Sequence, residues 1–202
     1  VLTITHQGYI KRTALNTYRT QRRGGRGVQG AMSKEEDFVE HLFIANTHNY
    51  MLFFTDQGKC YWLKVYDIPQ GGRAARGRAI VNLIGCDPGE KIEAFVSVKE
   101  FDDDHYIAMA TRNGIVKKTV LSAYGKPRKG GIYAIEIRDG DKLIEARVTN
   151  GEHDILLGTS EGKSIRFSEN NIRASGRKTM GVKGITLGSK EDHVVGMLVV
   201  RR

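Results

Sequence analysis

Thr111-Arg112-Asn113-Gly114 is the clearest of four copies of a short phrase that decides the fold of this 202-residue chain. The other copies are Thr5-His6-Gln7-Gly8, Thr55-Asp56-Gln57-Gly58 and Thr159-Ser160-Glu161-Gly162. Their glycines lie 50, 56 and 48 residues apart. Each copy stands between two runs of β-forming residues, and its last residue pair supplies the positive φ angles of a tight turn. Each copy therefore predicts a β-hairpin.

Each hairpin opens a longer repeat. A second glycine follows the first by 19 residues at Gly27, Gly77 and Gly181, and by 16 residues in the third copy, at Gly130. With the strands that follow, each repeat holds four short strands over roughly 50 residues. This period predicts an all-β, single-domain fold of radially arranged four-stranded blades, approximately 1–49, 50–105, 106–153 and 154–202. The one helical signal, a capping box at 33–36, predicts a single turn at most.

Composition limits the classes of function. Lys and Arg number 32 against 23 Asp and Glu, and this net charge of +9 favours an anionic partner. No apolar run reaches the roughly 18 residues of a membrane span. Val1–Ile4 reads as a strand entered midway and lacks the pattern of a signal peptide, which favours a fragment of a longer cytoplasmic protein. Cys60 and Cys86 favour two buried reduced thiols over one disulfide.

Charge follows the repeat. Residues 9–30, 59–78, 112–129 and 163–183, which follow the turn glycines or, in the third repeat, include the turn glycine, hold 23 of the 32 basic residues and only two acids. Because equivalent segments carry the same sign, a ring of blades gathers positive charge on one rim. A rim several blades long suits a curved polyanion, so we predict binding of double-stranded DNA through its phosphates. The candidate contacts in these segments are Lys11, Arg12, Arg19, Lys64, Arg73, Arg76, Arg78, Lys117, Lys118, Lys126, Arg128, Lys129, Arg166, Arg177 and Lys178.

A glycine- and arginine-rich loop in the first repeat is the most specific candidate. It consists of Gln21, Arg22, Arg23, Gly24, Gly25, Arg26 and Gly27, all predicted DNA contacts. Guanidinium groups bind phosphates bidentately, and glycine lets backbone amides approach them closely. The overlapping stretch 25–30 matches the dinucleotide fingerprint G-x-G-x-x-G, but the surrounding hairpins lack the βαβ unit that this fingerprint needs.

Catalysis and metal binding find little support. The chain has no P-loop and no G-x-S-x-G nucleophile motif. His105, His153 and His193 each adjoin an acid before a β run, and their shared repeat phase favours turn chemistry over a metal site. We expect no enzymatic activity, no metal and no cofactor in this chain.

The Gln21–Gly27 loop resembles the box that marks the C-terminal domains of DNA gyrase A, the DNA-cleaving protein of a type IIA topoisomerase, and the flanking stretches Thr5–Arg12 and Asp37–Phe43 fit as well. The resemblance covers essentially the whole chain. It implies a β-pinwheel, a propeller-like ring whose blades exchange strands, although the family ring usually has more blades than the four repeats here. It also implies that DNA wraps round the basic rim with positive handedness, so that the holoenzyme introduces negative supercoils.

The resemblance implies a wider setting as well. The partners are double-stranded DNA, the rest of gyrase A, and gyrase B in an A2B2 holoenzyme, which uses ATP and Mg²⁺ elsewhere, in the bacterial cytoplasm at the nucleoid. We expect no membrane contact and a monomeric isolated domain. Two alternatives stay open: the related C-terminal domain of topoisomerase IV, whose box is degenerate, and a protein-interaction propeller that uses its acidic face.

Overall fold

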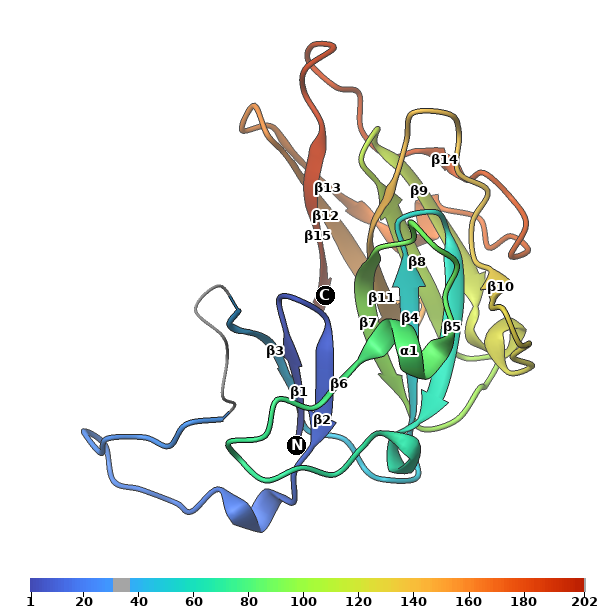
Figure 1. The fold of residues 1–202 in the computed structure, drawn as a ribbon. Helices are drawn as coiled ribbons and strands as arrows, with labels where there is room; N and C mark the ends of the chain where they lie inside the picture. The colour runs from blue at the N-terminus through green and yellow to red at the C-terminus, as the bar shows by residue number, and fades with distance from the viewer. Residues whose placement is uncertain (31–36, 202) are drawn as a thin grey trace.

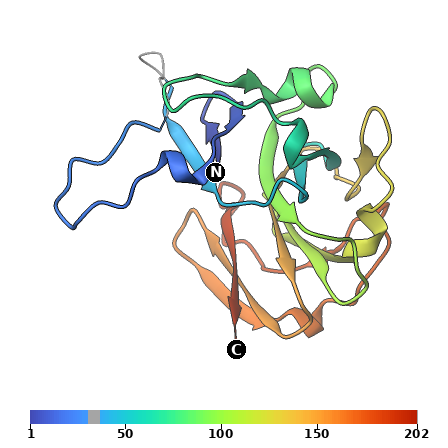
Figure 2. The same cartoon turned by 90° about the horizontal axis from the view of Figure 1, so that it is seen from below.

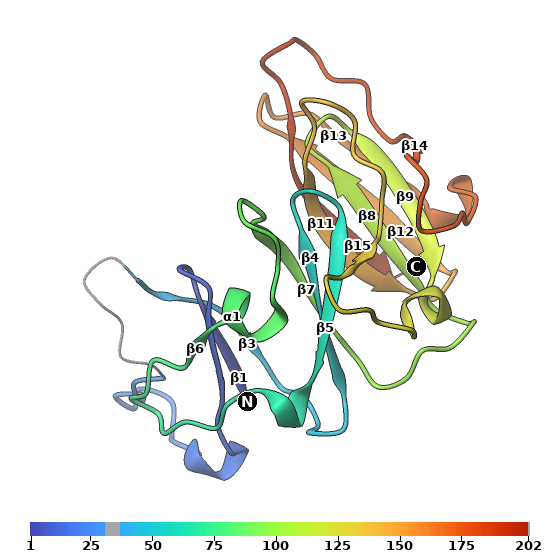
Figure 3. The same cartoon turned by 45° about the vertical axis from the view of Figure 1, so that its right-hand side comes forward.

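The computed structural model describes residues 1–30 and 37–201. The helical turn predicted at 33–36 lies outside these residues. The described chain forms four small antiparallel sheets that follow one another as blades (Figures 1 and 3). One five-residue helix, α1 (Ile80–Ile84), lies between the first two blades. The all-β, propeller-like fold predicted from the repeat is confirmed.

Three blades have four strands and the fourth has three. In spatial order, blade 1 contains β3 (Val39–Phe43), β1 (Leu2–Thr5), β2 (Tyr9–Arg12) and β6 (Arg78–Ala79); blade 2 contains β7 (Ile92–Val98), β4 (Tyr50–Thr55), β5 (Lys59–Lys64) and β10 (Ile132–Tyr133); blade 3 contains β11 (Leu143–Thr149), β8 (Tyr106–Thr111), β9 (Ile115–Val120) and β14 (Val182–Lys183); blade 4 contains β15 (Val194–Arg201), β12 (His153–Thr159) and β13 (Ser164–Ser168). Four 3-10 turns follow the hairpins: η1 (Leu15–Thr17), η2 (Val65–Asp67), η3 (Leu121–Tyr124) and η4 (Glu169–Asn171).

The outermost strand of each complete blade comes from the next repeat. β6 pairs with β2, β10 with β5, and β14 with β9. This is the strand exchange implied by the resemblance, and it means that a sequence repeat and a blade are not the same unit. Within the described residues no strand pairs with the outer edge of β13, so the expectation of four strands does not hold for blade 4.

The Thr-x-x-Gly phrase makes a turn because the threonine hydroxyl caps it. In the first copy the Gly8 N–H donates to the Thr5 carbonyl at 2.9 Å, and the Tyr9 N–H donates to Thr5 Oγ1 at 3.2 Å. The other copies repeat both bonds. The glycines have φ between +80° and +86°, whereas Asn113, like every other described non-glycine residue, has a negative φ. The prediction that both residues of the pair take positive φ is therefore wrong. In each turn the two central residues have negative φ, and only the glycine after them lies in the left-handed region.

The core lies between the blades. Ile4 and Phe53 belong to the apolar cluster that joins blades 1 and 2, and Phe54 and Met109 to the one that joins blades 2 and 3. A third cluster, around Leu157, joins blades 3 and 4. Because neighbouring strand residues point to opposite faces of a sheet, Phe53 and Phe54 fill two different interfaces. Each blade is thus buried by its neighbours, as the repeat predicts.

The two end blades share no core cluster. The blades follow one another round a ring (Figure 2), but no cluster among the described residues joins blade 4 to blade 1. Apolar side chains such as Leu42 on β3 and Leu198 on β15 stay exposed. Both cysteines are unpaired, as predicted, although only Cys60 is fully buried and Cys86 is half-buried.

Candidate nucleic-acid interface

The basic segments of the four repeats form loops on the periphery of the ring (Figure 2). We name them rim loop 1 (residues 18–27), rim loop 2 (69–77), rim loop 3 (125–131) and rim loop 4 (173–181). Rim loops 2 to 4 each end where their exchanged strand begins, so they run along the outer edge of the preceding blade. The Arg12 N–H donates to the Pro69 carbonyl at 2.9 Å, and the Ser175 N–H donates to the Lys118 carbonyl at 2.8 Å. The strand exchange therefore fixes the positions of rim loops 2 to 4.

A glycine closes each docked loop. These residues are Gly77, Gly131 and Gly181, with φ between +78° and +89°. A Cβ on Gly77 would lie 2.4 Å from the Ile10 carbonyl oxygen, so only glycine allows this approach. The assignment of Gly130 to this position from the sequence is wrong by one residue, because Gly131 directly precedes β10. Gly27 of rim loop 1 has φ +68°, but a Cβ added there would meet no atom within 4 Å, so no close approach requires glycine at this position. Rim loop 1 extends outward from the blades (Figures 1 and 2).

Most predicted contact residues are exposed. They are Arg19, Gln21, Arg22, Arg23, Gly24, Gly25, Arg26, Gly27, Arg73, Arg78, Lys126, Arg128, Lys129, Arg166 and Lys178. Arg166 lies apart on β13 and donates from Nε to Asp154 Oδ2 at 2.9 Å, which partly compensates its charge. The other basic side chains of this set form no ion pair with a described acidic residue. They lie within or next to the four rim loops, so the structure gathers them on the periphery.

Tyrosines contact three cations of rim loops 2 and 4, of which Arg76 and Arg177 are half-buried and Lys178 is exposed. The Arg76 guanidinium lies 3.7 Å from the centroid of the Tyr9 ring. Arg177 donates from Nη1 to the Tyr133 carbonyl at 3.0 Å, and Lys178 Nζ lies 5.0 Å from the centroid of the same tyrosine ring. Such contacts hold the charges of Arg76 and Arg177 at the surface although these two side chains are half-buried.

Arg12 and Lys64 are also half-buried. Arg12 donates from Nε to the Ile68 carbonyl at 2.7 Å. Lys64 Nζ lies 5.7 Å from the Tyr50 ring centroid and 5.4 Å from that of Tyr66. The tyrosine supports were missed by the sequence reasoning, and no local pattern announces them. The exposed Arg173 and Lys183 were also left out of the candidate contacts, although they lie in the basic segment 163–183.

Three of the predicted contacts are inside the protein. The exposed fractions of Lys11, Lys117 and Lys118 are 1%, 0% and 5%. Lys118 lies 3.4 Å from Glu169 Oε2, whereas Lys11 and Lys117 donate to backbone carbonyls. Desolvation, with a smaller contribution from the charge of Arg177, lowers the pKa of Lys117 to about 8. Burial takes all three lysines out of the candidate interface, because a phosphate cannot reach their ammonium groups.

The acidic segments have a structural task at the hairpin turns. Asp37 Oδ1 accepts the Gln7 N–H at 3.0 Å, and Asp192 Oδ1 accepts the Glu161 N–H at 3.0 Å. Asp141 does the same in the third repeat. Burial alone raises the pKa of Asp192, but N–H donors from Gly188 and Glu161 outweigh it and lower that pKa to about 2. These carboxylates cap turns at the strand ends, and the first turn also touches rim loop 2, because Arg76 donates from Nη2 to Gln7 Oε1 at 3.0 Å.

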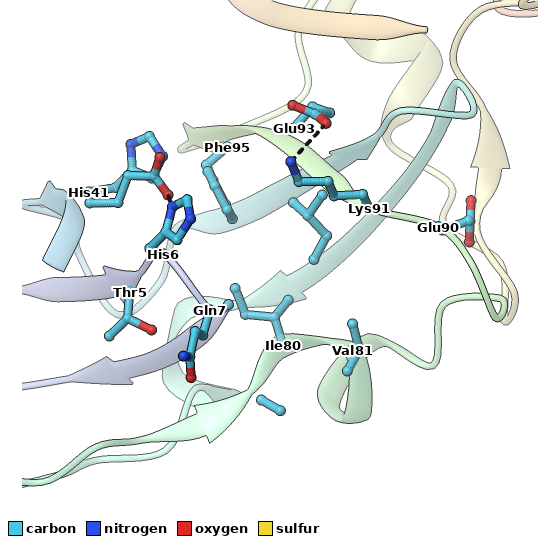
Figure 4. A pocket seen from close by; sticks show the side chains of 14 residues that line it. Thr5, His6, Gln7, His41, Ile80, Val81, Glu90, Lys91, Glu93 and Phe95 are labelled. Atoms are coloured by element: carbon cyan, nitrogen blue, oxygen red, sulfur yellow. Dashed lines mark hydrogen bonds and ion pairs between the residues drawn. The ribbon is translucent and has the colours of Figure 1, made fainter. Parts of the chain in front are cut away.

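A hollow of about 340 Å³ lies between blades 1 and 2 on this turn side (Figure 4). His6 Nδ1 lies 3.3 Å from Glu40 Oε2, and Lys91 Nζ lies 3.7 Å from Glu93 Oε1. Burial raises the pKa of Glu93, and the charge of Lys91 opposes this shift. Because the two cationic groups of these pairs already face carboxylates, the rim cations, which form no ion pair with a described acidic residue, are the stronger candidate site.

Metal-ligating side chains do not gather in the described part of the chain, where no group of three or more His, Cys, Asp or Glu residues is arranged to hold an ion. The histidines predicted to serve turn chemistry do so: His105 Nδ1 lies 2.9 Å from Asp102 Oδ1, and the His153 N–H donates to Glu169 Oε1 at 2.8 Å. No helix in residues 1–30 and 37–201 has the length and apolar character to cross a membrane.

Comparison with known proteins points to one family. The chain matches the DNA gyrase C-terminal domain, described as a β-propeller, over residues 1–46, 49–99, 105–150 and 153–201. The DNA gyrase A protein of Clostridium acetobutylicum is 52% identical over 184 residues, which make up 91% of this chain and 22% of that protein. The chain therefore spans about a fifth of the length of this relative.

Two solved structures share the fold. The C-terminal domain of DNA topoisomerase IV superposes with a TM-score of 0.83 at 29% identity, covering 100% of this chain and 61% of that one. The DNA gyrase A C-terminal domain superposes with a TM-score of 0.76 at 25% identity, covering 98% of this chain and 64% of that one.

Proposed function

Since this chain belongs to the family of DNA gyrase C-terminal domains, we propose that it binds double-stranded DNA along its rim loops and wraps it with positive handedness. The observation that carries this proposal is the series of exposed basic side chains from four repeats that form no ion pair with a described acidic residue. They belong to loops on the periphery of the ring (Figure 2). Phosphate contacts along a curved rim give strong, salt-dependent affinity with little sequence preference.

Rim loop 1 is built to present its arginines. Gln21 Oε1 accepts the Gly27 N–H at 3.2 Å, and the Arg22 carbonyl accepts the Gly25 N–H at 3.0 Å. A Cβ on Gly25 would lie 2.5 Å from Gln21 Oε1, so glycine lets the glutamine close the loop. The first and last residues of the Gln21–Gly27 box thus hold the loop together, while its arginines stay exposed.

Wrapping has to overcome the stiffness of DNA. Bending a site of 20–30 base pairs by 40–90° costs about 1–6 kcal/mol, which several phosphate contacts offset. Arginine also enters a minor groove that bending narrows. The exposed box arginines, on a loop clear of the blades, suit this inward side of the bend.

The larger assembly belongs to the same proposal. The chain acts as one part of a gyrase A protein that pairs with gyrase B in an A2B2 enzyme, a type II topoisomerase of the bacterial cytoplasm that acts at the nucleoid. DNA cleavage and the use of ATP and Mg²⁺ take place outside this chain, which serves by geometry and charge and, alone, as a monomer.

Ligation of a nicked DNA circle in the presence of the chain tests wrapping. We expect a shift in linking number with the unchanged chain. The triple variant R22A/R23A/R26A should lose more of this shift than of its DNA affinity. The matched control is K91A/K142A/K190A, which removes the same charge from exposed positions at the acidic turns and should leave the shift unchanged. An unaltered linking number with the unchanged chain contradicts the proposal.

The C-terminal domain of topoisomerase IV is the second candidate, because one of the two solved structures above carries that name. The intact Gln21–Gly27 box and the 52% identity to a gyrase A protein favour gyrase. For a protein-interaction propeller, by contrast, we expect partner binding that survives high salt; loss of DNA binding with retention of a protein partner would favour that function.

A further inference from the structure

Two of the buried lysines occupy the same position in different blades. Lys11 and Lys117 are each the third residue after a turn glycine, on the strand that receives an exchanged strand. Both are at most 1% exposed, and neither forms an ion pair with a described acidic side chain. A buried ammonium group needs other acceptors, because an unpaired charge inside a protein is strongly unfavourable.

Three of the four acceptors are carbonyls of the loop that arrives from the next repeat, and the fourth, that of Ala134, follows β10 in the same repeat as Lys117. Lys11 Nζ donates to the Gly72 carbonyl at 2.9 Å and to the Arg73 carbonyl at 2.5 Å, both in rim loop 2. Lys117 Nζ donates to the Arg177 carbonyl in rim loop 4 and to the Ala134 carbonyl at 2.6 Å. Arg73 and Arg177 stand at the same place, four residues before the closing glycine of their loops.

The other two blades, which lack the lysine, show which feature of the docked loop accompanies it. At the equivalent position blade 2 has Tyr61, whose hydroxyl lies 2.5 Å from Glu90 Oε2, and the loop that docks there has Pro127 in place of the arginine. Blade 4 has Ile165, on the strand β13, to which no described loop docks. Within the described blades, the buried lysine therefore occurs where the docked loop has an arginine four residues before its closing glycine.

We propose that Lys11 and Lys117 are positioning residues for DNA binding, each of which holds a basic rim loop in place by gripping its backbone carbonyls from inside. This inference rests on the proposed function. Because the grip is on the main chain, the loop side chains stay free to face the DNA. A loop held beforehand loses less conformational entropy when DNA binds, which favours the bent complex.

The variants K11M and K117M test the grip, because methionine keeps the aliphatic stem and removes the ammonium group. The matched control is I165M, at the equivalent position with no docked loop. The Ser175 amide, which donates to the Lys118 carbonyl beside the grip, should exchange its hydrogen about tenfold faster or more in K117M than in the unchanged chain or in I165M. Each lysine variant should lose roughly a quarter of the linking-number shift if the four rim loops contribute equally.

A double-mutant cycle separates positioning from general stability. If Lys117 acts through rim loop 4, K117M has little further effect on the linking number once the outward cations of that loop are removed in R173A/K178A. An equal loss in both backgrounds, or a full linking-number shift in folded K11M and K117M, overturns the inference.

The unchanged chain is the reference that separates this inference from the proposed function. If the unchanged chain fails to shift the linking number, the proposed function fails. If the unchanged chain and both lysine variants shift it equally, only the role of the lysines is refuted. Should K117M not fold, K11M tests the same grip in a different blade.

Discussion

Gly181 and Val116 touch backbone to backbone: a Cβ on Gly181 would lie 2.4 Å from the Val116 carbonyl oxygen. This contact joins rim loop 4 to blade 3, directly before the exchanged strand β14. The close approach, together with a φ of +87°, leaves no room for any other residue. The position of the basic loop thus depends on an uncharged residue.

We expect G181A to undock rim loop 4. The substitution adds a left-handed strain of about 1–2 kcal/mol and forces β14 away from β9. Urea unfolding should show a lower free energy of unfolding, and DNA affinity should fall with it.

The variant G27A is the control, because Gly27 has a similar φ, +68°, and open space around it. It carries the backbone strain without the collision. Equal losses of stability in G27A and G181A would show that the contact with Val116 does not matter.

The buried pair of Lys118 and Glu169 should be a strong contributor to stability. Burial alone raises the pKa of Glu169, but the Thr149 hydroxyl, the His153 N–H and the Lys118 charge outweigh it, so the folded pKa lies below 4.5. Removing the carboxylate in E169A leaves Lys118 buried and unpaired, which costs about 3–5 kcal/mol. Chemical denaturation at neutral pH measures this loss, and E145Q, in the exposed pair with Arg147, should change stability little.

The same pair predicts a response to acid. Because the folded pKa of Glu169 is lower than the unfolded value, its contribution is complete above about pH 4.5 and is lost as the pH falls through the folded pKa. E169Q should therefore show a weaker decline of stability at acidic pH. A decline as steep as in the unchanged chain would contradict this assignment.

Salt dependence should report which cations touch phosphates. With about five to eight phosphate contacts, the logarithm of DNA affinity should fall against the logarithm of salt with a slope of roughly −5 to −7. R128A in rim loop 3 should reduce the magnitude of this slope by about 0.9. K142A, whose Nζ lies 4.0 Å from Asp56 Oδ2 on the turn side, should leave the slope as it is. A slope near zero in the unchanged chain would rule out a phosphate-binding rim.

Lys117 should make stability rise with alkaline pH. Its folded pKa is about 8 while the ordinary value is 10.5, so between these values the unfolded chain binds more protons than the folded one. Stability then increases as the pH rises through this window. Between pH 7.5 and 9.5, the free energy of unfolding of the unchanged chain should therefore rise relative to that of K117M, because the other titrating groups are common to both proteins. Parallel curves would contradict a lowered pKa.

Much of the fold followed from local chemistry in the sequence. Threonine and glycine at fixed spacing predicted hairpins that form at Thr5–Gly8 and at the other three copies, because the hydroxyl cap and the positive φ are satisfied within a few residues. The periodic charge predicted a basic periphery, and residues such as Arg22 and Lys126 are exposed there. The box residues were recognisable because rim loop 1 is closed by its own atoms, from Gln21 to Gly27.

Whether a lysine is buried or exposed could not be predicted from the residues next to it in the sequence. Lys11, Lys117 and Lys118 lie in basic segments like their exposed neighbours, and only the arrival of a loop from another repeat or of a glutamate more than 50 residues away buries them. The mismatch at Gly130 has the same origin, since the contact with Tyr61 that selects Gly131 crosses from one repeat to another.

The amino-acid sequence by itself determined the hairpins, their number and the sign of the charge in each segment, because these depend on residues next to one another along the chain. Tertiary structure alone decided which strand completes which blade, which lysines face the solvent and which hold a loop from within. Those outcomes depend on contacts between repeats, and the energy of burying a charge is set by whatever the fold brings against it.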